Sequence, residues 1–145
     1  MYESLNDLHS FERKKNPLSS LNIGKRKLIE NWLDEMNIKG YTINDDLSIN
    51  VNRNVWLNGG LNKFPDYIKF NKIEGNFFCA NIQLISLIGC PNSVGNIFNC
   101  DDNELISLTG CPSYAGRFYC NNNKTQFTKE DVLKRCKVDK NRIYV

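Results

Sequence analysis

The sequence CANIQLISLIGCP at residues 79–91 returns as CDDNELISLTGCP at residues 100–112. Both copies begin with a cysteine and end in Leu-Ile-Ser-Leu-x-Gly-Cys-Pro. A phenylalanine lies two residues before the first cysteine of each copy, and the same Phe-x-Cys pair recurs at Phe118 and Cys120. A frame that recurs every 20 or 21 residues predicts a protein built from stacked repeats.

The spacing inside the frame predicts the shape of one repeat. Phe-x-Cys has a period of two, so both side chains leave the same face of an extended strand. Leu84 and Leu87 are three residues apart, which suits an irregular or 3₁₀-like return segment better than a second strand. Gly89 and Pro91 then mark a turn. One such unit has too small a core to fold alone, so we expect a solenoid with parallel strands on one side and turns on the other.

Written as one unit, the repeat is V-G-x-x-F-x-C-x-x-N-x-L-x-S-L-x-G-C-P. This frame resembles a short leucine-rich repeat, similar to those of bacterial secreted effectors. Its wording is most similar to small leucine-rich-repeat proteins of large tailed bacteriophages, over residues 41–145. The resemblance implies an α+β solenoid, a leucine-rich-repeat stack of parallel strands, and an accessory protein that binds and blocks a host enzyme or defence component. In this sequence Ile82 replaces the asparagine that Asn103 and Asn123 supply, and the third unit lacks both leucines.

The flanking sequence predicts caps at both ends of the stack. One helical face carries Leu28, Ile29, Trp32, Leu33 and Met36, and a strand follows with Leu47, Ile49 and Val51 alternating. We assign residues 1–20 to a flexible or weakly helical N-terminal segment and 21–52 to an N-terminal helix and edge strand. We assign 53–123 to the repeats and 124–145 to a C-terminal cap, in which Thr128 begins a helix and RIYV adds a strand.

Composition and charge restrict the class of protein. The chain of 145 residues fits one domain and has a net charge of +3. It has no apolar run long enough to span a membrane and no apolar stretch near its start, so we expect a cytoplasmic protein. Residues 75–123 hold one basic residue against three acids, which disfavours nucleic-acid binding because phosphates need clustered cations. The basic residues of 124–145 suit a solvated face better than a nucleic-acid site.

The six cysteines invite a metal or redox interpretation. Zinc sites draw on close pairs such as Cys-x2-Cys, whereas neighbouring cysteines here lie 9 to 16 residues apart and His9 is the only histidine. We therefore expect Cys79, Cys100 and Cys120 to form an inward column, with Cys90 and Cys111 stacked at the turn. Cysteine buries well as a small apolar side chain. A metal site and a disulfide or redox pair are the less favoured alternatives, and no cofactor is expected.

The alternate positions of each strand predict an outward surface. If Phe77 and Cys79 point inward, the residues between them point outward. The sequence offers no paired nucleophile and base, so we expect a binding protein rather than an enzyme. A self-associating virion or assembly component is the main alternative, a nucleic-acid-binding protein the weaker one, and the outward column could also be covered by the N-terminal segment or a second copy. The candidate protein-binding residues are Trp56, Phe78, Asn99, Asp101, Arg117 and Tyr119.

Overall fold

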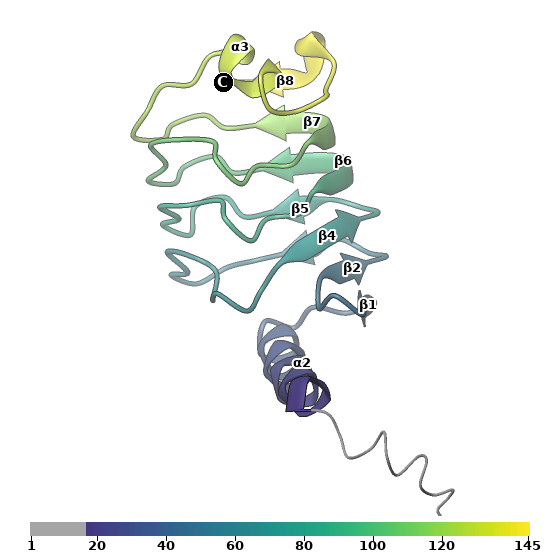
Figure 1. Ribbon diagram of the computed structural model, residues 1–145. Helices are drawn as coiled ribbons and strands as arrows, with labels where there is room; N and C mark the ends of the chain where they lie inside the picture. Colours follow the sequence, from purple (N-terminus) through teal and green to yellow (C-terminus); the bar gives the residue numbers. More distant parts are fainter. Residues whose placement is uncertain (1–16) are drawn as a thin grey trace, which may run out of the picture.

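The computed structural model describes residues 17–145, with side chains from residue 21 onward. Figure 1 shows successive turns of chain stacked on one another, with a helix at the N-terminal end and a short helix at the other. The elements are α2 (Pro17–Glu35), β1 (Tyr41–Ile43), β2 (Ile49–Val51), β3 (Val55–Trp56), β4 (Phe70–Ile73), β5 (Phe77–Phe78), β6 (Ser93–Asn99), β7 (Tyr114–Tyr119), α3 (Lys129–Leu133), the 3₁₀ helix η2 (Lys140–Arg142) and β8 (Ile143–Tyr144).

The chain forms a parallel β-solenoid of about five turns, which confirms the predicted fold class. Its strands form two adjoining parallel ladders. One ladder contains β2, β4, β6 and β7, and the other contains β3, β5, β6, β7 and β8. β6 and β7 belong to both ladders, and their pairing register shifts between Val94 and Ile97. Each turn therefore bends at a corner midway along its strand region.

Glycine permits the close stacking at these corners and turns. A Cβ atom on Gly95 would overlap the backbone carbonyl of Glu74 in the turn below. Gly110 has φ +93°, and a Cβ atom there would lie 2.6 Å from the carbonyl of Leu87. Only glycine combines a positive φ with such a close approach to backbone at low cost.

The core contains the predicted inward columns. Phe77, Phe98 and Phe118 are fully buried, with ring centroids 6.0 Å and 5.1 Å apart between neighbours. Cys79, Cys100 and Cys120 form the second buried column. Val55 and Ile143 occupy the phenylalanine position in the first and last rungs of the ladder. The inward direction predicted for both columns is confirmed.

The return segments between strands are irregular, as the spacing of their leucines predicted. Residues 80–92 contain neither helix nor strand, yet Leu84 and Leu87 are fully buried. The side chain of Asn103 is buried beneath this segment and forms hydrogen bonds with backbone groups of two turns. Ile82, at the corresponding position of the turn before, is also buried and packs in the core.

Helix α2 covers the N-terminal end of the core. Its Trp32 side chain contacts Phe64 and Phe70 edge to face, with ring centroids 6.3 Å apart in both pairs. Ile29 and Leu33 are fully buried beside it. Leu28 was predicted to share this face, but it is 49% exposed because it lies at the face's edge. The helix begins at Pro17, so residues 17–20 are helical, and the predicted state of residues 1–16 lies outside the described residues.

The edge strand and the C-terminal cap differ in detail from expectation. Ile49 and Val51 are buried on β2, but Leu47 lies in the turn before it at φ +70°. Thr128 caps α3 through a reciprocal pair of bonds with Asp131. Leu133, predicted to face inward, is 39% exposed because the helix ends at that residue. β8 then continues the parallel ladder beyond β7.

Candidate protein-binding strand face

One outward position recurs in register on every rung of the second ladder. Trp56 pairs with Phe78, Phe78 with Asn99, and Asn99 with Tyr119. This is the column that the strand period predicted. The structure extends it by one rung, because Tyr119 pairs with Tyr144 on β8. We call the five residues Trp56, Phe78, Asn99, Tyr119 and Tyr144 the central column.

The aromatic rings of the central column form two stacked pairs. The Trp56 and Phe78 ring centroids are 4.6 Å apart at an interplanar angle of 39°, and those of Tyr119 and Tyr144 are 4.4 Å apart at 16°. Asn99 lies between the two pairs. Trp56 is 65% exposed, whereas Phe78 and Tyr119 are half-buried by their neighbours. The rings are therefore held in place by the sheet and by each other, while their outer surfaces face solvent.

Arg117 lies beside the central column. It is two residues before Tyr119 on β7 and therefore on the same face of the strand. Its neighbour on β6 is Ile97, whose backbone N–H donates to the side-chain oxygen of Asn76 at 2.9 Å. The flank of the column thus presents a half-buried isoleucine and a half-buried guanidinium on an ordered backbone.

Asp101 has a different environment from the other predicted binding residues. One carboxylate oxygen accepts the backbone N–H of Asn121 at 2.6 Å and its side-chain amide at 3.2 Å. The N–H of Asp101 donates to the side-chain oxygen of Asn99 at 2.9 Å. Partial burial raises the pKa of this carboxyl group, against the opposing effect of the Asn121 hydrogen bonds. Its observed contacts therefore join two rungs of the stack.

The cysteines lie behind this face and within the core. Cys79, Cys90, Cys100, Cys120 and Cys136 are buried and Cys111 is half-buried, and all six are free thiols. Burial raises the pKa of Cys111 to about 11 and that of Cys120 and Cys136 to about 12. These thiols are therefore neutral near pH 7 and poor nucleophiles or metal ligands in the folded protein.

Sequence reasoning missed two further surface features. Asn71 donates to Asn50 at 2.9 Å and Asn92 donates to Asn71 at 3.0 Å, which makes an asparagine ladder along the first ladder of strands. On the turn side, Ile85, Ile88 and Ile106 are more than half exposed. The 21-residue spacing of the asparagines, and of Ile85 and Ile106, was the available signal.

No protein-family model, curated protein or solved structure matches the chain. Within residues 17–145, neither helix is long and apolar enough to cross a membrane. The same residues contain no group of three or more His, Cys, Asp or Glu side chains arranged to hold a metal ion. The fold and the strand face are thus the features from which a function can be inferred.

Proposed function

We propose that the chain is a non-enzymatic protein-binding module that docks its strand face on another protein. The observation that supports this most is the central column, with its two stacked aromatic pairs on consecutive parallel strands. Large aromatic side chains at fixed positions are the residues that dominate binding energy at protein interfaces.

The rigidity of the face favours binding. Side chains that are already ordered lose less conformational entropy when a partner covers them. Each ring of the column stands on a hydrogen-bonded strand and contacts one other ring. Arg117 adds a cation beside Tyr119, and arginine is enriched with tryptophan and tyrosine at interface hot spots.

The proposed contact residues are Trp56, Phe78, Tyr119 and Arg117, with Asn99 as a polar group between the aromatic pairs. Asp101 contributes indirectly, because its carboxylate holds the Asn121 backbone in the next rung. We therefore assign it the role of a positioning residue that keeps two rungs of the face in register.

The resemblance to short leucine-rich-repeat proteins of large tailed bacteriophages supports a more specific proposal. A phage accessory protein of this kind would act in the host cytoplasm, where its cysteines would stay reduced. We infer that its partner is a host defence protein and that binding inhibits that protein. The charge of the repeats, with few cations, supports a protein partner over nucleic acid.

The test is quantitative capture of host proteins by two triple variants. Trp56→Ala/Phe78→Ala/Tyr119→Ala should lose the specific partner captured by the wild type, since hot-spot truncations each cost about 2 kcal/mol or more. The matched control is Ile85→Ala/Ile88→Ala/Ile106→Ala, which removes exposed apolar side chains from the turn side. Circular dichroism verifies that both variants fold. If the aromatic variant keeps every partner, or only the isoleucine variant loses one, the proposal is wrong.

A further inference from the structure

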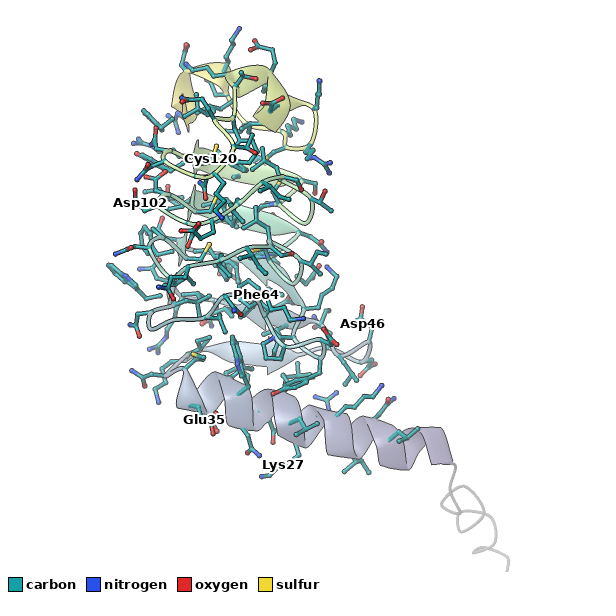
Figure 2. All side chains as sticks on the ribbon, turned by 90° about the vertical axis from the view of Figure 1, so that its left-hand side faces the viewer. Lys27, Glu35, Asp46, Phe64, Asp102 and Cys120 are labelled. Atoms are coloured by element: carbon teal, nitrogen blue, oxygen red, sulfur yellow. The ribbon has the colours of Figure 1, made fainter. Side chains whose placement is uncertain are left out.

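Helix α2 extends past the body of the solenoid. Figure 2 shows the N-terminal half of the helix projecting beyond the stacked turns. Residues 21–28 are exposed except for Arg26, which is half-buried and donates to the carbonyl of Ile43 at 3.0 Å. Isolated helices shorter than about 12 residues are marginal in water. The projecting half is therefore expected to need a partner that stabilises it.

The exposed side of this half carries a narrow apolar stripe. Leu21 is 56% exposed and Leu28 is 49% exposed. They are seven residues apart, so at 3.6 residues per turn they lie within about 20° of each other around the helix. Gly24 lies between them, with no atom within 4 Å of a Cβ built on it. Glycine is unfavourable inside a helix, but it allows a second helix to approach closely.

The stripe is nearly symmetric about Gly24. Leu21 precedes Gly24 by three residues and Leu28 follows it by four. A two-fold axis beside Gly24 would therefore bring Leu21 of one copy against Leu28 of another, and the reverse. We propose that the chain forms a two-fold dimer in which the α2 helices pack antiparallel and cross at Gly24. Such an interface is isologous and closes on itself.

The charges of the helix fit an antiparallel second copy. Its last turn carries Asp34 and Glu35 and no basic residue, and its first turn carries no acid. This distribution opposes the helix macrodipole, whose positive end is at the N-terminus. In the antiparallel pair the acidic end of one helix lies beside the N-terminal end of the other. The sequence just before that end is basic, with Arg13, Lys14 and Lys15.

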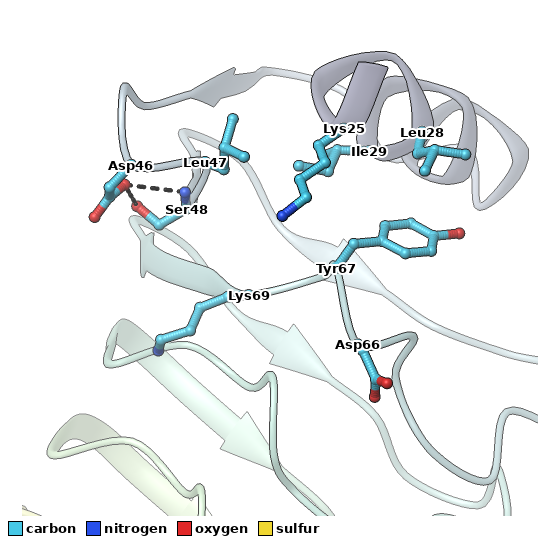
Figure 3. A pocket seen from close by; sticks show the side chains of 9 residues that line it. All are labelled: Lys25, Leu28, Ile29, Asp46, Leu47, Ser48, Asp66, Tyr67 and Lys69. Carbon is cyan, nitrogen blue, oxygen red and sulfur yellow. Dashed lines mark hydrogen bonds between the residues drawn. The ribbon is translucent and has the colours of Figure 1, made fainter. Parts of the chain in front are cut away.

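A cavity beside α2 can receive the apolar side chain of the second copy. The cavity measures about 590 Å³ and lies between the helix, the turn before β2 and the segment before β4. Leu28, Leu47 and Tyr67 form its apolar wall, and Lys25 and Lys69 line its polar side (Figure 3). Leu47 contributes its side chain from a left-handed backbone at φ +70°, which a leucine rarely adopts. Leu21 of the second copy is the expected occupant.

Sedimentation equilibrium on the 145-residue chain tests the dimer. We expect the wild type to dimerise, and Leu21→Glu and Leu28→Glu each to raise the dissociation constant at least about tenfold. The matched control is Ile23→Glu, because Ile23 is 70% exposed on the same helix but lies about 140° around it from Leu28. A wild type that stays monomeric throughout the micromolar range overturns the proposal. So does a dimer weakened only by Ile23→Glu.

Cross-linking gives a second readout that does not depend on a charged variant folding. A cysteine in Gly24→Cys would face its symmetry mate near the axis, so oxidation by diamide should give a disulfide-linked dimer. Ile23→Cys should give none, since that position faces away from the axis. Equal cross-linking at both positions, or none at either, contradicts the proposed interface. Both outcomes are independent of whether the strand face binds a protein.

Discussion

The side-chain amide of Asn103 donates a hydrogen bond of 2.8 Å to the carbonyl oxygen of Cys79, a residue of the preceding turn. The same amide oxygen accepts the backbone N–H groups of Ile82 and Leu84 at 3.1 Å and 3.0 Å. Asn103 is only 5% exposed. One buried side chain thus satisfies polar backbone groups where the return segment leaves the strand ladder, which the fold otherwise could not satisfy.

Replacing Asn103 by alanine should lower the free energy of unfolding by about 2–4 kcal/mol, because buried donors and acceptors would lose their partners. Urea denaturation followed by circular dichroism measures this loss. The control is Asn58→Ala, at an exposed position, which should change stability by no more than about 0.5 kcal/mol. Equal effects at the two positions would show that Asn103 does not join the turns.

The close approach of turns at Gly110 can be separated from backbone strain. Gly110→Ala should be more destabilising than Gly59→Ala, by about 2 kcal/mol or more. Both glycines have positive φ, but only the Gly110 Cβ would meet backbone, at 2.6 Å, whereas Gly59 has open space. Thermal unfolding of the two variants gives the comparison. Similar melting temperatures would mean that the turns are less tightly stacked than described.

The buried thiols predict a loss of stability at alkaline pH. The pKa of Cys111 is raised to about 11 and that of Cys120 and Cys136 to about 12, with burial as the main cause. A thiol whose pKa is raised by folding stabilises the fold fully below its unfolded pKa, 9.0. That contribution is lost as pH rises through the folded pKa. Denaturation midpoints should therefore fall between about pH 9 and 12.

A variant assigns that effect to a particular thiol. Cys136→Ala removes one titrating group, so the decline of its denaturation midpoint above pH 9 should be shallower than that of the wild type. Its stability near pH 7 should be lower, because a buried side chain is truncated. An unchanged alkaline slope would show that Cys136 titrates normally in the folded protein.

Asp101 should behave as a structural residue with an unfavourable charge. Its pKa is raised mainly by burial, so its contribution to stability is present at low pH and is lost as pH rises through the folded pKa. Asp101→Asn removes the charge and keeps an acceptor for Asn121, so its melting temperature at pH 7 should equal or exceed that of the wild type. Asp101→Ala removes the acceptor and should cost about 1 kcal/mol. If Asn and Ala destabilise equally, the hydrogen bond to Asn121 contributes nothing.

The inward columns and the outward column were predictable from the sequence, because each depends only on the repeat period and the two-residue alternation of a strand. Phe77 and Phe98 repeat at 21 residues, and their neighbours Phe78 and Asn99 must then face the other way. The role of Asn103 followed from its place in the same frame.

Other features depend on geometry that the period does not contain. The fifth member of the column, Tyr144, follows Tyr119 by 25 residues because α3 and η2 intervene, so it breaks the repeat spacing. The bend between the two ladders is a property of the backbone at Gly95 and Asn96, which the side-chain pattern does not reveal. The bonds between Asp101 and Asn121 depend on a carboxylate that turns along the stack instead of toward solvent.

Phe77 and Phe78 offer the most direct test, because adjacent residues of one type face opposite sides of a single strand. Phe77 is fully buried, and Phe78 stands in the outward column against Trp56. Phe77→Ala should lower the free energy of unfolding by about 3–5 kcal/mol, and Phe78→Ala by about 1 kcal/mol. Guanidinium denaturation of the two variants measures both values. Equal losses, or a larger loss at Phe78, would contradict a solenoid that buries one phenylalanine and presents the other for binding.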